Sequence, residues 1–88
     1  MKSAVTIIRF RDACKLCGYS RAGMYRAIKA ELMPPPIHIS ENCSGFTEHE
    51  LTVMNAAIIS GRSKDERRQL ARELKVARAR LLVEVLAE

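Results

Sequence analysis

The spacing of apolar positions predicts two short helices near the start of the chain. Small or apolar side chains recur at helical intervals over residues 11–17, and Gly18 suits the left-handed position that ends a helix. Ser20 offers a hydroxyl cap for a second helix, residues 21 to about 30, whose apolar residues lie three and four apart. Two short helices joined by a tight turn that contains glycine predict a helix-turn-helix.

Periodicity then changes from helical to alternating. Three consecutive prolines, residues 34–36, stop any helix because proline lacks the N–H donor. Ile37-His38-Ile39 alternates apolar and polar positions, residues 40–44 are rich in turn formers, and Gly45-Phe46 returns as a second strand. This segment predicts a two-stranded β-hairpin, which we interpret as the wing of a winged helix-turn-helix.

Two capping boxes predict two further helices. Thr47 with Glu50 opens a helix to about Ser60, and Ser63 with Glu66 opens a long helix without a breaker before the C-terminus. The expected fold is therefore mainly α, a winged helix-turn-helix with a long C-terminal helix. We divide the chain into a DNA-binding domain, residues 1–61, and an amphipathic helix, residues 62–88.

Composition places the chain in the ordinary globular class. It has 88 residues, of which 48% are hydrophobic and 28% charged, so we expect one small domain plus an extension. No apolar run approaches the roughly 20 residues that cross a bilayer, and the start lacks the features of a secretory signal. We expect a soluble, cytoplasmic protein that does not bind membranes.

Positive charge is concentrated on the predicted helix-turn-helix. The net charge is +5, and residues 1–40 hold seven basic side chains against two acidic ones. Residues 41–62 are net acidic, and residues 63–88 hold seven bases against five acids. This distribution favours a polyanionic partner for the first part of the chain.

The order of these features resembles a known family. Residues 8–29, IRFRDACKLCGYSRAGMYRAIK, are similar to the opening of AlpA-family prophage regulators, with a hydrophobic-Arg start, Gly-hydrophobic-Ser-Arg and a Tyr-Arg pair in the second helix. Residues 37–39 and the run GFTEHEL at 45–51 resemble that family's wing and third helix, with Phe46 at an aromatic position. The resemblance covers about residues 7–59. It implies a fold shared with MerR-like domains and excisionases.

Three features depart from the family pattern. Gly23 stands where the family usually has a hydroxyl residue, and glycine inside a helix costs about 1 kcal/mol relative to alanine. The wing turn, residues 41–44, lacks the arginine that relatives often carry there. The helix after Gly61 lies outside the pattern, so the resemblance implies no role for it.

A helix-turn-helix reads base edges with the exposed side chains of its second helix, while neighbouring groups bind phosphates. Arginine can pair with guanine, and tyrosine can reach a phosphate or a thymine methyl. Arg11 and Lys15 are expected to bind the DNA backbone, and His38 and Asn42 to contact DNA from the wing. The second helix supplies Ser20, Arg21, Ala22, Tyr25, Arg26 and Lys29. The alternative interpretation is a solvated basic face.

The cysteines suggest a competing metal site. Cys14 and Cys17 form a CxxC pair, and with His38 and Cys43 they make a four-ligand zinc set. Cys14, however, occupies the position where the two helices meet, and a buried cysteine there acts as a small apolar residue. We predict no metal and no cofactor. We also predict no enzyme activity, because no nucleophile with a base, paired carboxylates or phosphate loop is present.

The last helix carries two stripes. Its apolar row is expected to hold a second copy of the chain or a protein partner such as an integrase, and consists of Leu70, Leu74, Leu81 and Val85. Its basic stripe either extends the DNA footprint or is only solvated, and consists of Lys64, Arg68, Lys75 and Arg78. We therefore keep two hypotheses. One is a regulator or excisionase that binds double-stranded DNA, and the other is an adaptor with weak DNA binding.

Overall fold

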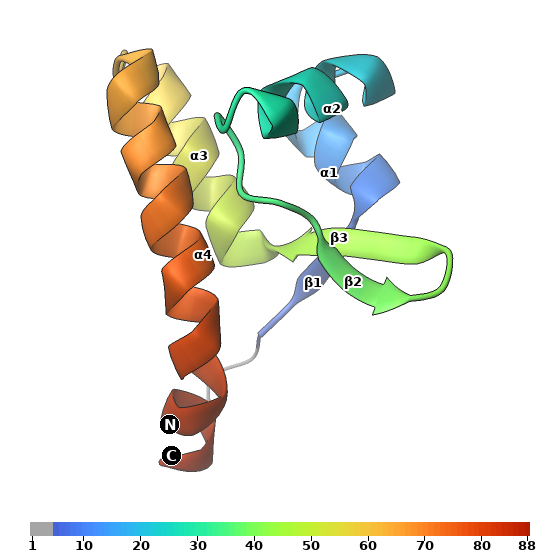
Figure 1. The fold of residues 1–88 in the computed structure, drawn as a ribbon, viewed down its shortest axis with the longest axis vertical. Coiled ribbons are helices and arrows are strands. Elements are labelled where there is room, and N and C mark those ends of the chain that lie inside the picture. Colours follow the sequence, from blue (N-terminus) through green and yellow to red (C-terminus); the bar gives the residue numbers. More distant parts are fainter. Residues whose placement is uncertain (1–4) are drawn as a thin grey trace.

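The computed structural model describes residues 5–88 as four helices and a three-stranded antiparallel sheet (Figure 1). The elements are β1 (Ile7–Arg9), α1 (Phe10–Cys17), α2 (Arg21–Lys29), β2 (Ile37–Ser40), β3 (Cys43–Thr47), α3 (Glu48–Ile59) and α4 (Lys64–Leu86). The mainly α fold, the hairpin and the long C-terminal helix are confirmed. No helix in this part of the chain is long and apolar enough to cross a membrane.

The sheet has one more strand than the hairpin alone. β2 pairs with β3 as predicted, with an irregularity in register between His38 and Ser40, and β1 pairs with the other edge of β3. A Cβ at Gly45 would collide with the carbonyl oxygen of Ile8, so glycine lets β1 approach β3. The sequence pattern did not predict β1. Three residues are too few for alternation to reveal a strand.

The helix ends follow the predicted caps. The Ser20 hydroxyl accepts a hydrogen bond from the Gly23 amide at 3.0 Å, and both capping boxes are formed. A Cβ at Gly23 would lie 3.1 Å from the Ser20 Oγ, so glycine leaves room for this cap. Gly18 and Gly61 adopt left-handed φ angles after α1 and α3, whereas Glu31 takes the same conformation, with φ of 63°, after α2.

One hydrophobic core takes residues from every element except β2. Phe46, Met24 and Met54 are fully buried at its centre, and Ala71 of α4 belongs to the same cluster. Leu70 and Leu74 pack against this cluster from α4. The first part of α4 thus packs on the winged domain. The division between residues 61 and 62 stays a prediction.

Candidate nucleic-acid interface

The inward face of α2 fixes the direction in which its polar side chains point. Met24 and Ala27 are buried in the core and Ile28 packs against it. Because these positions face inward, the remaining side chains point to solvent. The exposed residues are Ser20 at the cap and Arg21, Ala22, Tyr25, Arg26 and Lys29 on the helix. The structure therefore presents the predicted α2 set on one exposed side of the helix-turn-helix.

Arg21 rests on a pair of aromatic rings. Phe10 and Tyr25 stack with centroids 4.8 Å apart, and the Arg21 guanidinium carbon lies 5.7 Å and 5.8 Å from the two centroids. Phe10 is buried and also packs 6.1 Å from Phe46 of β3. These cation–π contacts hold the guanidinium at the start of α2 while the Tyr25 side stays half exposed.

Sequence reasoning missed the part that Phe10 plays. It counted Phe10 only as a member of the family-like opening, because a residue at the start of α1 is not near α2 in sequence. The sequence does indicate that Arg21 and Tyr25 are neighbours, because residues four apart lie on one side of a helix. The contact of Phe10 with that pair depends on how α1 packs against α2.

The other predicted DNA contacts come from α1 and the hairpin. Arg11 and Lys15 are exposed one turn apart on α1, and His38 and Asn42 are exposed on β2 and its turn. Figure 1 shows the helix-turn-helix and the hairpin on one side of α3, with α4 along the other side. The predicted DNA-binding side chains thus lie on α1, α2 and the hairpin, and α4 meets this group of elements at the end of α2, where Arg68 reaches the Ala30 carbonyl.

The cysteines do not form the alternative zinc site. Burial raises the pKa of the Cys14 thiol, against the opposing charge of Arg21, and burial together with Cys14 raises the pKa of Cys17. Burial thus favours the neutral thiol, which packs as a small apolar side chain. Among residues 5–88, no three His, Cys, Asp or Glu side chains gather as ligands, and Cys14, Cys17 and Cys43 are free.

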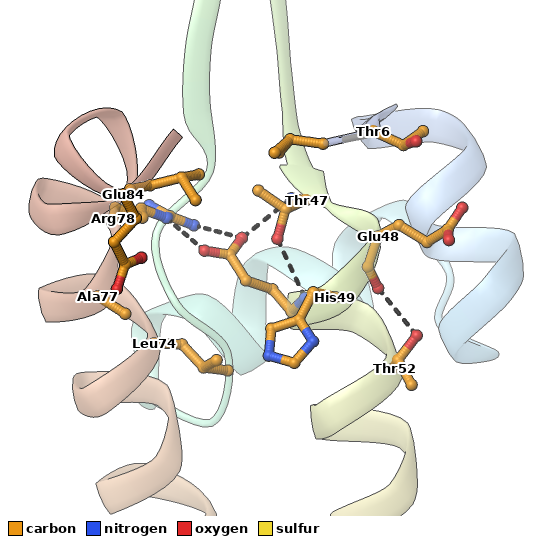
Figure 2. Close-up of a pocket in the computed structure, with 12 residues that line it drawn as sticks. Thr6, Thr47, Glu48, His49, Thr52, Leu74, Ala77, Arg78 and Glu84 are labelled. Atoms are coloured by element: carbon orange, nitrogen blue, oxygen red, sulfur yellow. Dashed lines mark hydrogen bonds and ion pairs between the residues drawn. The ribbon is translucent and has the colours of Figure 1, made fainter. Parts of the chain in front are cut away.

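A cavity of about 570 Å³ lies between α4 and the junction of β3 with α3 (Figure 2). Figure 2 shows the Arg78 guanidinium reaching from α4 towards the start of α3. Its Nε and Nη2 donate to the two oxygens of the buried Glu50 at 2.6 Å and 2.9 Å. Glu50 also accepts from the Thr47 amide in the capping box. Both carboxylate oxygens are therefore engaged, and the pair joins α4 to α3.

This arrangement bears on both stripes of α4. Arg78 binds Glu50, and Arg68 donates to the Ala30 carbonyl at 2.9 Å and pairs with Asp65, so two of the four stripe residues bind inside the chain. In the apolar row, Leu70 and Leu74 pack on their own core. That the row mediates self-association stays a prediction. Other apolar side chains of α4 are far more exposed, namely Val76, Leu82, Val83 and Leu86.

The fold and its exposed basic helix define a winged helix-turn-helix protein of the DNA-binding class. A family model described as prophage CP4-57 regulatory protein (AlpA) matches residues 6–53, more than half of the chain. The chain belongs to the AlpA family of prophage regulatory proteins, a family of DNA-binding regulators. No curated protein and no solved structure matches it.

Proposed function

We propose that this protein binds specific sites on double-stranded DNA and regulates genes of a prophage or other mobile element in the cytoplasm. The observation that carries the proposal is the exposed basic side of α2, with Arg21 supported by Phe10 and Tyr25. Because the rings already hold the Arg21 guanidinium in place, this side chain loses little conformational entropy when it contacts a base edge. The proposal needs no cofactor and no catalytic residue.

Each side chain takes a role that its chemistry suits. Arg21 and Arg26 read guanine edges, Ala22 packs on a thymine methyl, and Tyr25 contacts a phosphate or a methyl group. Lys29, Arg11 and Lys15 bind phosphates. The Ser20 hydroxyl already caps α2, so Ser20 contributes through the helix terminus it stabilises. His38 and Asn42 contact the backbone from the wing.

Selection of binding sites from a random duplex pool tests this function. Chelator-treated protein is used, and affinity for the enriched site is then measured against salt concentration. We expect one enriched motif and a steep fall in affinity as salt rises, because phosphate contacts release counterions. A pool that stays random after repeated rounds would contradict sequence-specific binding.

The same interface serves an excisionase, which bends DNA so that an integrase can remove the element. Energy transfer between dyes at the two ends of the enriched site measures bending. A large bend together with stimulated excision by an integrase supports this role, and an unbent site at a promoter supports transcriptional regulation alone.

An adaptor is the second candidate function, and the exposed apolar side chains at the end of α4 favour it. In that case α4 holds a protein partner such as an integrase, and DNA binding is weak. Leu82→Glu with Leu86→Glu changes only exposed positions. Loss of integrase binding with intact DNA affinity supports the adaptor, whereas unchanged integrase binding argues against it.

A further inference from the structure

α4 has an inward face and an outer face of different character. Ala71 is buried and Leu70 and Leu74 pack on the core, so these residues mark the inward face. Residues half a turn away are exposed along the helix, and every residue from 82 to 88 is exposed. The outer face has no residue in the hydrophobic core, and its one described ion pair with the winged domain joins Arg72 to Glu31 at 3.8 Å.

Apolar residues on the outer face follow coiled-coil spacing. Val76, Ala79, Val83 and Leu86 lie three, four and three residues apart, which keeps them on one line of a helix. Val76, Val83 and Leu86 are 62%, 68% and 74% exposed. Gln69 and Arg72 continue the same spacing towards the start of α4. We call this line of six residues, from Gln69 to Leu86, the outer seam.

The outer seam has a hollow towards the start of α4 and the exposed side chain of Val83 towards its end. A depression of about 230 Å³ is lined by Gln69, Arg72, Glu73, Val76 and Arg80. In a coiled coil, four such neighbouring residues form the hole that receives one side chain of the facing helix. If two copies of α4 run antiparallel with Val76 opposite the partner's Ala79, the partner's Val83 falls on this hollow.

Charges beside the outer seam select the same register. Glu73 and Arg80 are seven residues apart, about 10 Å along the axis, which is too far for an ion pair within one helix. In the antiparallel register Glu73 faces the partner's Arg80, and two-fold symmetry repeats this pair. A parallel arrangement would instead place Arg72 against the partner's Arg72 and Arg80 near the partner's Lys75.

We propose that two copies of this chain associate through the outer seam, with their α4 helices antiparallel. The winged domains then lie on the outside of the helix pair, because each packs on the opposite face of its own α4. Two helices that meet only along this line of six residues are expected to bury less than the about 800 Å² per partner of a standard interface, so we expect the dimer to be weak in free solution. DNA with two half-sites would strengthen it through effective concentration.

Sedimentation of the full chain without DNA tests the proposal. We expect the average mass of the unmodified protein to rise towards that of a dimer as concentration increases. Val76→Glu with Val83→Glu should keep the monomer mass throughout the series. The matched control is Ile58→Glu with Ile59→Glu, which adds the same charge at two apolar residues of α3 that are 41% and 85% exposed and should leave association unchanged.

A charge exchange tests the register. Glu73→Arg and Arg80→Glu should each weaken self-association roughly tenfold, since both place like charges in two symmetric pairs. An equimolar mixture of the two variants should form a heterodimer, because every facing pair then has opposite charges.

Two results would overturn the proposal. One is a constant monomer mass of the unmodified protein at its highest soluble concentration. The other is stronger self-association of Arg80→Glu alone, which a parallel arrangement would produce by pairing it with the partner's Lys75. Both are measured without DNA, so neither affects the proposed regulatory function.

Discussion

Arg21 and Arg26 are exposed on α2, and their proposed task is base reading, whereas Lys15 on α1 is proposed to bind phosphate. We expect Arg21→Ala and Arg26→Ala each to cost roughly 1 to 3 kcal/mol on the selected site and to relax sequence preference. Lys15→Ala should weaken binding to specific and random DNA equally. Titration of all three variants on both kinds of duplex measures this. Equal losses on both duplexes for every variant would place base reading elsewhere.

The Phe10 ring supports Arg21 and Tyr25 without being exposed itself. We expect Phe10→Leu to reduce affinity for the selected site about two- to fivefold, because a cation–π contact contributes roughly 0.5–1 kcal/mol at exposed positions. Phe46→Leu is the control, since Phe46 is also a buried ring, and the cation–π contacts of Arg21 are with Phe10 and Tyr25. If both variants bind the selected site alike, the ring does not orient Arg21.

At the scale of elements, the start of α4 depends on an ionised carboxylate. The Ser63 backbone amide, followed by its hydroxyl, lowers the pKa of the exposed Glu66. Since the folded pKa is depressed, the stabilisation is present above the ordinary glutamate pKa and is lost as pH falls through the lowered value.

An NMR titration of the Glu66 carboxyl carbon should show this depressed pKa in the intact protein. Ser63→Ala removes the hydroxyl partner of the box and should move the midpoint of Glu66 upwards while the first turn of α4 frays. A midpoint equal to that of an unstructured glutamate in the intact protein would contradict the capping account.

The pairing of β1 with β3 depends on a residue without a side chain. Gly45→Ala should destabilise the protein by roughly 1 to 3 kcal/mol, because the new methyl meets the Ile8 carbonyl and the strands must separate. Denaturant unfolding measures the loss. Ser44→Ala, at the neighbouring position of β3, should cost far less, and an equal cost would contradict the close approach.

For the molecule as a whole, the Glu50–Arg78 pair fastens α4 to the winged domain. Arg78→Leu should lower the free energy of unfolding by about 3 kcal/mol, because a buried carboxylate is left without its cation. Adding Glu50→Gln should recover part of this loss, since the charge is removed while the amide oxygen still accepts from Thr47. A double variant no more stable than the single one would show that the charge of Glu50 is not the cause.

The helices and their ends could be predicted from the sequence, because capping residues, glycines and apolar spacing act locally. Ser20, Thr47 and Ser63 mark helix starts because their hydroxyls satisfy free amides, Gly18 and Gly61 mark helix ends, and apolar spacing identifies the inward face of α2. Tertiary structure decided the rest. It added β1 through the space at Gly45, placed Phe10 under Arg21, and turned Arg68 and Arg78 inward. It also determined which face of α4 is free, because periodicity locates an apolar stripe and only packing decides whether the stripe is covered.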